Sequence, residues 1–344
     1  MAQGYVECRF ETGTGPGKES GVSSSFAAKV IYFPATTFNF DTNPNPLERD
    51  DEMRTQNEPI RFDQEAFAPS WSMDIRAYPD VAAFLLKAHL GAPTTTAGDG
   101  VIADLAAAVI PVGATRHTWT APYATGSTPQ TIMFRVVVPE HSMYWDVRGA
   151  SVESLEWSTP DSGGVMLRVS GKANYISSIA NPALTATYES LAIAPFLRAH
   201  AALTWLASSA TCETLNVGVS KQVEHVRTYG GGSKWPDITE HGEGVVQISG
   251  QFDGRTITSA DWAAMIAATR FTALISYVHT SIIATAYPYK MFIQAPNTSA
   301  AYISGGPADI QNRKRTPSSW NFRFTRDSAV SATIQVVNAT ASYA

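Results

Sequence analysis

One stretch near the start of the chain carries the residue types that bind phosphate. The segment Thr12–Ser20 (TGTGPGKES) holds glycines and a lysine in the manner of a phosphate-binding loop. That loop needs a glycine where Thr12 stands, a serine or threonine after Lys18 where Glu19 stands, and a helix that follows. None of these is present, so we predict that residues 1–25 form a flexible or partner-ordered arm.

Acidic residues gather in two further places. Calcium ligands alternate and turn on a glycine, whereas the run Glu48–Arg54 (ERDDEMR) mixes acids with arginines. That mixture favours a charged patch that faces solvent or another subunit. Glu153 and Glu156 could be a carboxylate pair for glycoside hydrolysis. They lie in a strand pattern (SVESLEW) at a spacing that predicts opposite faces, so we interpret them as part of an outward or subunit-facing strand edge.

Histidines and cysteines form no catalytic or metal-binding pattern. The chain has seven histidines and two cysteines, Cys8 and Cys212, without the spacing of a zinc site. Neither GxSxG nor HExxH occurs. His89 ends a predicted helix, where it can interact with the helix dipole. We therefore predict no catalytic residue, no cofactor and no metal.

Composition narrows the class of protein. Of 344 residues, 44% are hydrophobic and only 16% are charged, and the formal net charge is -5. This balance favours a β protein with extensive subunit contacts. A mildly acidic chain is poorly suited to binding nucleic acid, because contacts to phosphate need clustered lysine and arginine. We find no signal peptide and no apolar run long enough to span a membrane.

The segment Glu65–Gly91 organises the first part of the chain. Trp71, Met73 and Ile75 alternate with polar residues, which predicts a half-buried strand. Asp80 is expected to cap a helix whose apolar face contains Val81, Phe84, Leu85 and Ala88.

A similar strand and helix recur at Glu243–Ala268, roughly 180 residues later, which suggests duplication. There Trp262, Met265 and Ile266 take the places of Val81, Phe84 and Leu85. We predict an N-terminal arm over residues 1–25, a first domain over residues 26–180 and a second domain over residues 181–344. Each domain is expected to hold one long polar loop, Asp41–Phe62 or Ser220–Gly242.

Further strands are predicted in both halves, together with a short helix at Ala103–Val109. The expected strands have the alternation and the turn spacing of a meander. They are Ala28–Phe40, Gln130–Val138, Ser151–Trp157, Val165–Ala173, Ala202–Leu206, Cys212–Val219, Phe271–Val278, Tyr289–Ile293, Ser319–Arg326 and Thr333–Thr340.

This doubled order of strand, long loop, strand, helix and meander resembles the tail tube (major tail) proteins of long-tailed bacteriophages. The resemblance lies in the loop Asp41–Phe62 and in the runs Trp71–Gly91 and Ser151–Ala173. It implies a mainly β fold with a few helices (α+β), in which two tandem β-sandwich or half-barrel domains are each flanked by one α-helix.

The resemblance also implies assembly. Six such domains make a ring in this family, so a chain with two of them is expected to form homotrimers with pseudo-sixfold symmetry, a pseudohexameric ring. Rings stack helically into a hollow tube, and the long loops reach the next ring. The residues then expected at subunit or ring contacts are Glu48, Arg49, Asp50, Asp51, Arg54, Arg227, Lys234, Trp235 and Asp237.

The function implied is that of a structural virion protein, located in the tail and assembled in the host cytoplasm. It would form the conduit for DNA ejection, with a weakly acidic, polar lumen past which DNA moves without specific binding. Its other partners would be the tape-measure protein and the tail-tip and terminator proteins, and it would contact no membrane. The alternatives are a distal-tail or baseplate ring protein of the same fold, a carbohydrate-binding β-sandwich module, and a glycosidase on a β scaffold.

Overall fold

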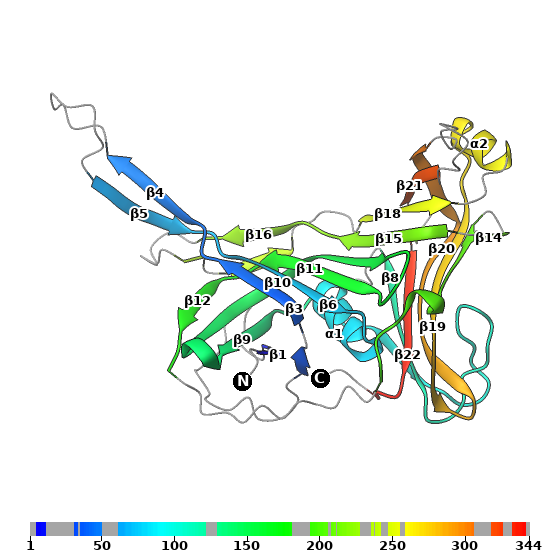
Figure 1. Ribbon diagram of the computed structural model, residues 1–344, viewed down its shortest axis with the longest axis horizontal. Helices are drawn as coiled ribbons and strands as arrows, with labels where there is room; N and C mark the ends of the chain where they lie inside the picture. Colours follow the sequence, from blue (N-terminus) through cyan, green and yellow to red (C-terminus); the bar gives the residue numbers. More distant parts are fainter. Residues whose placement is uncertain are drawn as a thin grey trace.

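The structure is a computed structural model built mainly from antiparallel strands (Figure 1). The residues that it describes are 5–11, 31–33, 35–49, 61–121, 129–180, 193–205, 208–210, 212–227, 235–236, 238–241, 247–254, 259–305, 318–325 and 332–341. The helices are α1 (Pro79–Leu90), α2 (Ser259–Ile266), and the 3-10 helices η1 (Pro139–His141) and η2 (Arg198–His200).

The strands follow the chain in two groups. The first group is β1 (Tyr5–Phe10), β2 (Ile31–Phe33), β3 (Ala35–Asp41), β4 (Pro44–Arg49), β5 (Arg61–Phe67), β6 (Ser70–Arg76), β7 (Thr94–Ala97), β8 (Thr115–Ala121), β9 (Ile132–Val138), β10 (Met143–Thr159), β11 (Met166–Lys172) and β12 (Tyr175–Ser178). The second group is β13 (Ala201–Trp205), β14 (Ser208–Ala210), β15 (Cys212–Ser220), β16 (Val223–Val226), β17 (Ile238–His241), β18 (Gln247–Gly254), β19 (Phe271–Ala284), β20 (Tyr287–Gly305), β21 (Ser318–Phe324) and β22 (Ala332–Asn338).

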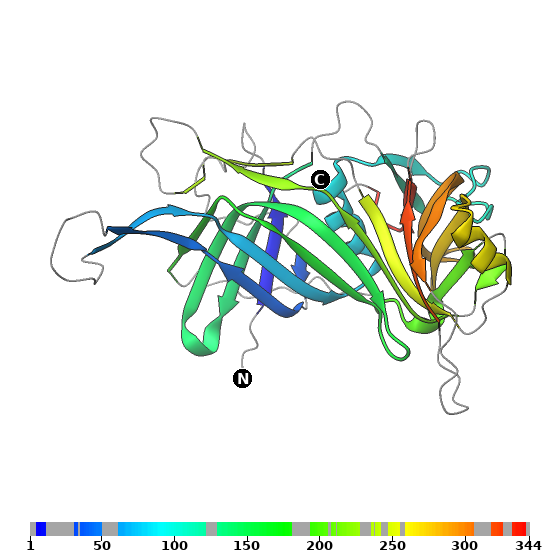
Figure 2. The same cartoon turned by 90° about the horizontal axis from the view of Figure 1, so that it is seen from above.

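One continuous series of strand pairings runs through both halves of the chain, and we term it the long sheet. Its order is β3-β6-β11-β10-β15-β18-β21-β20. The halves join where β10 pairs with β15, from Ser154 opposite Ser220 to Thr159 opposite Leu215. Seen from above, these strands follow one another across the molecule as a curved layer (Figure 2).

Two unusually long strands link the long sheet to a second layer in each half. The N-terminal part of β10 pairs with β9 and β12, and β9 pairs with β1. Likewise the N-terminal part of β20 pairs with β19 and β22, and β19 pairs with β13. Because ordinary strands have about 3 to 10 residues, strands of 17 and 19 residues can serve both layers.

The pairing pattern of the first half recurs in the second, down to its irregularities. A β-bulge interrupts β3 between Ala35 and Thr37, and the same interruption occurs in β15 between Cys212 and Thr214. A second bulge skips Glu153 in β10 and Ile303 in β20. Since a bulge depends on the whole pairing register, these matches set the two halves in residue-by-residue correspondence and support duplication.

An exchange between an aromatic residue and glycine accompanies this correspondence. Trp71 of β6 lies opposite Gly171 of β11, whereas Gly250 of β18 lies opposite Phe322 of β21. A Cβ at Gly171 would come within 1.9 Å of the Ser151 carbonyl oxygen, and one at Gly250 within 2.5 Å of the Phe322 ring. Each half therefore packs one aromatic ring against one glycine at this site. In the first half the ring comes from the first strand of the pair, and in the second half it comes from the second strand.

The hydrophobic core lies behind the long sheet and around α1. Trp71, Met73 and Ile75 are buried, and the residues between them are half-buried, as the alternation predicts. Val81, Phe84 and Leu85 of α1 are also buried. Figure 1 shows α1 inside the molecule and α2 at one end of it. The two helices occupy corresponding positions in the chain but differ in burial: Trp262 is 40% exposed and Ile266 is 67% exposed.

Two local predictions are wrong. The helix α1 starts with Pro79 after Tyr78, and no side chain caps it, because proline already has the backbone angle of a first helical residue. The Asp80 carboxylate instead accepts a hydrogen bond from Thr340 Oγ1 at 3.2 Å. Residues 103–109 are a tight turn rather than a helix, because the Asp104 carboxylate accepts the backbone N–H groups of residues 106 and 108, both at 2.9 Å.

Two predictions about irregular segments are corrected as well. Tyr5–Phe10, inside the predicted arm, forms β1, because Val6, Cys8 and Phe10 alternate and are buried in the core. Residues 1–4 and 12–25 of the predicted arm lie outside the described residues. Both predicted long loops have strands as arms: β4 pairs with β5 and β16 pairs with β17. We term them the first and second ribbons; the division of the chain at residue 180 stays a prediction.

Candidate assembly surfaces

One face of the long sheet is polar across its width, and we term it the polar face. The strand registers place its side chains in rows that cross both halves. One row is Thr37, Asp74, Arg168, Glu156, Gly218, Ser249 and Arg323; a second is Asn39, Ser72, Ser170, Ser154, Ser220 and Gln247; a third is Ser158, Asn216, Gln251, Asn321 and Ser304. Hydroxyl and amide groups form much of this surface.

Charges of both signs are interspersed on the polar face. Its acidic residues are Asp41, Asp74, Glu153, Glu156 and Asp253, and its basic residues are Arg76, Arg168, Lys172 and Arg323. Arg168 lies 4.0 Å from Asp74, and both side chains are largely exposed. Such exposed pairs contribute little to stability. Acidic and basic residues thus occur together on this surface, and its described residues do not form the clustered basic charge that holds phosphate backbones.

The polar face is hollowed where the halves meet. An open groove of about 560 Å³ is lined by strands β10, β15, β18, β21 and β20. Glu156 lines this groove, and Glu153 lines a neighbouring one with Ser72 and Lys172. The prediction that the two glutamates face opposite ways is therefore wrong, because the bulge at Glu153 adds one residue to the strand.

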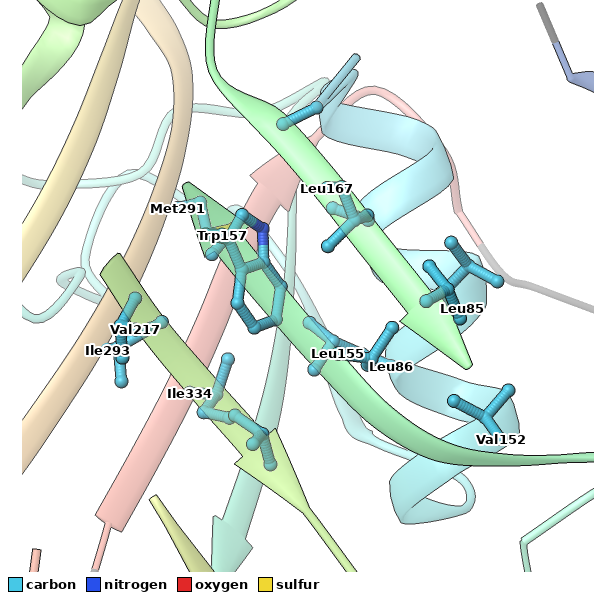
Figure 3. Packing of buried hydrophobic residues seen from close by; sticks show 14 of the residues in the cluster. Leu85, Leu86, Val152, Leu155, Trp157, Leu167, Val217, Met291, Ile293 and Ile334 are labelled. Carbon is cyan, nitrogen blue, oxygen red and sulfur yellow. The ribbon is translucent and has the colours of Figure 1, made fainter. Parts of the chain in front are cut away.

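The opposite face of the long sheet joins the halves through buried apolar side chains. Trp157, at the junction, is fully buried. Figure 3 shows Trp157 and Leu155 of β10 between Leu86 of α1 and residues of the second half, among them Val217 and Ile334. Burial of this kind stabilises by about 25 cal/mol for each Å² of apolar surface. The junction is consequently part of the core, not a surface contact between separate bodies.

Helix α1 is tied to the bulge of β10 through a buried histidine. The Nδ1 atom of His89 lies 2.8 Å from the Val152 carbonyl oxygen, which is an acceptor, so that nitrogen donates. Burial lowers the pKa of His89 to about 4, and the nearby Lys221 ammonium acts in the same direction. The imidazole is therefore neutral at pH 7, and the expected interaction of a cationic His89 with the helix dipole is not made.

The structure brings two of the nine predicted contact residues together at the base of the first ribbon. The Trp235 ring stacks on Phe67 with centroids 4.1 Å apart and packs edge-on to Tyr175 at 4.8 Å. The Arg227 guanidinium donates to the Phe67 carbonyl oxygen. These contacts hold the second ribbon's segment against the end of β5, so part of each side chain's role is internal.

The remaining predicted contact residues are placed only in part. Glu48 and Arg49 lie on β4, near the outer end of the ribbon that projects from the body in Figure 1. Five lie outside the described residues: Asp50, Asp51, Arg54, Lys234 and Asp237. A role for these seven at subunit or ring contacts stays a prediction.

Sequence reasoning missed the polar face as a candidate site. Its signal is present in each strand, because Ser70, Ser72 and Asp74 alternate with the buried residues of β6. A single strand does not reveal which strands lie beside it, however. The rows appear only once the register across both halves is known.

Metal and membrane sites were also sought. Among the described residues, no three histidine, cysteine or acidic side chains are grouped so that they could hold a metal ion. Neither α1 nor α2, the α-helices of the described part, is long and apolar enough to cross a membrane.

These features define a class: a β-rich protein with a recurring strand pattern and a polar sheet surface. The chain belongs to the phage tail tube protein family, whose family model matches residues 9–336. A comparison with curated proteins found no match. The chain is accordingly a structural component of a phage tail, and the family is structural rather than enzymatic.

Proposed function

We propose that three copies of the chain close into a ring, that rings stack into the tail tube, and that the polar face lines its channel. The supporting observation is the pair of strands at the ends of the long sheet. Among the described strands, only β6 pairs with β3, and residues 301–305 of β20 pair with β21 alone. These two strands correspond to β15 and β10, which pair with each other inside the chain.

The β10–β15 junction therefore serves as a template for the contact between copies. Counting from the two bulges, Ser304 takes the place of Ser154, and Asn43 takes the place of Ser220. In the proposed ring, β20 of one copy pairs antiparallel with β3 of the next, near this position. Closure leaves no unpaired edge in the long sheet, which would otherwise be a site of uncontrolled association.

The mixed polar face suits a channel through which DNA passes during ejection. It offers hydroxyl and amide groups and charges of both signs rather than a continuous basic surface. The phosphate groups of DNA are therefore expected to bind it only weakly. A tape-measure protein would occupy the channel before ejection, and tail-tip and terminator proteins would cap the tube. Assembly in the host cytoplasm is part of the same proposal.

Electron microscopy and mass measurement of the purified protein test this proposal. A ring of three copies has a mass of about 111 kDa, three times 37.0 kDa, and stacked rings appear as tubes of constant bore. A particle that stays monomeric at high concentration, or a ring of six chains, would contradict the proposal. Rings that never stack would instead favour a distal-tail or baseplate ring protein.

We also propose that the ribbons connect successive rings. Replacing residues 48–62 with an Asn-Gly turn keeps the first ribbon's base, where Leu47 lies opposite Asp63. The shortened protein should form rings but not tubes. Tubes of unchanged length and stability would exclude the first ribbon as a ring-to-ring contact.

A further inference from the structure

Helix α2 differs in its surroundings from its counterpart α1. Val81 and Leu85 of α1 are fully buried, whereas the corresponding residues of α2 are exposed, Trp262 by 40% and Ile266 by 67%. Met265 and Ala264 of α2 are partly buried against the core. The helix thus packs on its own half by one side and presents an apolar side outward, which is costly in water.

Part of the burial of α1 comes from the other half of the chain. This helix lies against β10 of its own half and also against β20 and β22 of the second half. One hydrogen bond reinforces that contact, because Thr340 of the second half donates to Asp80 at 3.2 Å. The Trp119 indole of β8, a first-half strand that pairs with β22, donates to the Gly91 carbonyl oxygen at 2.9 Å. Helix α2 lies against β20 of its own half.

A second difference in burial occurs at the opposite end of the long sheet. Counting from the shared bulge, Phe38 and Phe40 of β3 take the places of Leu215 and Val217 of β15. Leu215 and Val217 are buried on β15 beside β10, where Val217 lies opposite Trp157, whereas Phe38 and Phe40 are only partly buried. Trp145 packs edge-on to Phe40 at 5.3 Å and is also partly buried. We term these three residues the aromatic rim.

We propose that the outward apolar side of α2, formed by Trp262 and Ile266, docks on the aromatic rim of a second copy of the chain. Inside each copy α1 contacts β20 and β22, whose counterparts in the first half are β10 and β12. Trp145 of β10 lies on that corresponding surface, and it packs against Phe40 of β3. This inference rests on the proposed ring and adds the second-layer contact that accompanies the pairing of β20 with β3.

Side-chain sizes differ between the internal junction and the ends of the long sheet. Leu155 of β10 lies opposite Val219 of β15, and the corresponding residues are Gly305 of β20 and Thr42 directly after β3, both of which are smaller. Phe40 of β3 takes the place of Val217, which lies opposite Trp157. The contact between copies would therefore occupy the same position as the internal one with a different set of side chains.

The positions of the two surfaces fix the kind of contact. Helix α2 lies at one end of the molecule, whereas β12 lies on the far side of the body and β3 lies between them (Figure 1). A contact between different surfaces of identical subunits is head-to-tail, and it closes into a ring when the rotation permits.

The test compares Ile266→Glu with Val101→Glu, a control that places the same charge on another exposed apolar residue, 78% exposed. Both variants should fold, as judged by their circular dichroism. Ring formation by Ile266→Glu should need at least about a tenfold higher concentration than by wild type, while Val101→Glu should assemble like wild type. Unchanged assembly of Ile266→Glu, or equal loss in both variants, would overturn the docking contact.

A photo-crosslinking residue in place of Ile266 tests the receiving surface directly. In assembled wild-type-like particles it should attach to peptides of a second copy that contain β3, β10 or β12. Attachment within its own chain or to other strands would refute the inference while leaving the ring proposal intact. If the unmodified protein forms no ring, the proposed function itself fails.

Discussion

Replacing His89 by glutamine should remove a large part of the acid sensitivity of the fold. His89 is fully buried, and its pKa is about 4 instead of 6.5. As the pH falls below 6.5, the unfolded chain binds a proton at this residue and the folded chain does not. Stability is therefore lost between pH 6.5 and about pH 4.

The size of the effect follows from that interval. Each pH unit of difference corresponds to about 1.4 kcal/mol, so lowering the pKa from 6.5 to about 4 costs about 3 kcal/mol of unfolding free energy at pH 4. At pH 5 the loss is about 2 kcal/mol, a substantial share of a total near 5 to 15 kcal/mol. Glutamine does not titrate, and its side-chain amide can still donate to the Val152 carbonyl.

Urea unfolding of dilute protein at pH 7, 6, 5 and 4.5 measures the difference. Wild type and His89→Gln should diverge progressively below pH 6.5, with the variant losing less stability. Other histidines titrate in both proteins, so only the difference between the two curves reports on residue 89. Parallel curves would show that the folded protein accepts a proton at His89 readily, and the argument from burial would be refuted.

Two further predictions concern the packing of the first half. Gly171→Ala should lower the free energy of unfolding by about 1 to 3 kcal/mol, because the new Cβ would meet the Ser151 carbonyl oxygen. Gly218→Ala is the control: its Cβ would have its nearest neighbours at 3.8 Å, so the same urea titration should show a much smaller change. Asp146→Ala should lower the free energy of unfolding by about 3 to 5 kcal/mol, because it removes the carboxylate that the buried Arg135 guanidinium contacts at 2.8 Å. A thermal unfolding transition within a degree or two of that of the wild type would contradict this prediction.

The sequence predicted those features that depend on neighbours in the chain. Alternation identified β6, and the run from Val81 to Ala88 identified α1, because each signal lies within one element. The two similar halves were visible for the same reason. The family resemblance was confirmed by the match over residues 9–336.

Features that depend on pairing between distant strands could not be predicted. The bulge at Glu153 arises from its register with β11, and it changes which face the glutamate occupies. The exposure of one apolar side of α2 could not be predicted either. The sequence pattern of an amphipathic helix is the same whether or not another surface covers its apolar side. Local hydrogen bonding by Asp104 likewise overrode the helical composition around it.

The covalent joining of two halves affects how such a protein can change over time. In a single-domain subunit one set of residues forms every contact around a ring, so any substitution alters all contacts at once. Here the internal junction uses Leu155 and Val217, and the ends of the long sheet carry Gly305 and Phe40 in the matching positions. Mutations can therefore accumulate at one kind of junction while the other is held constant by selection.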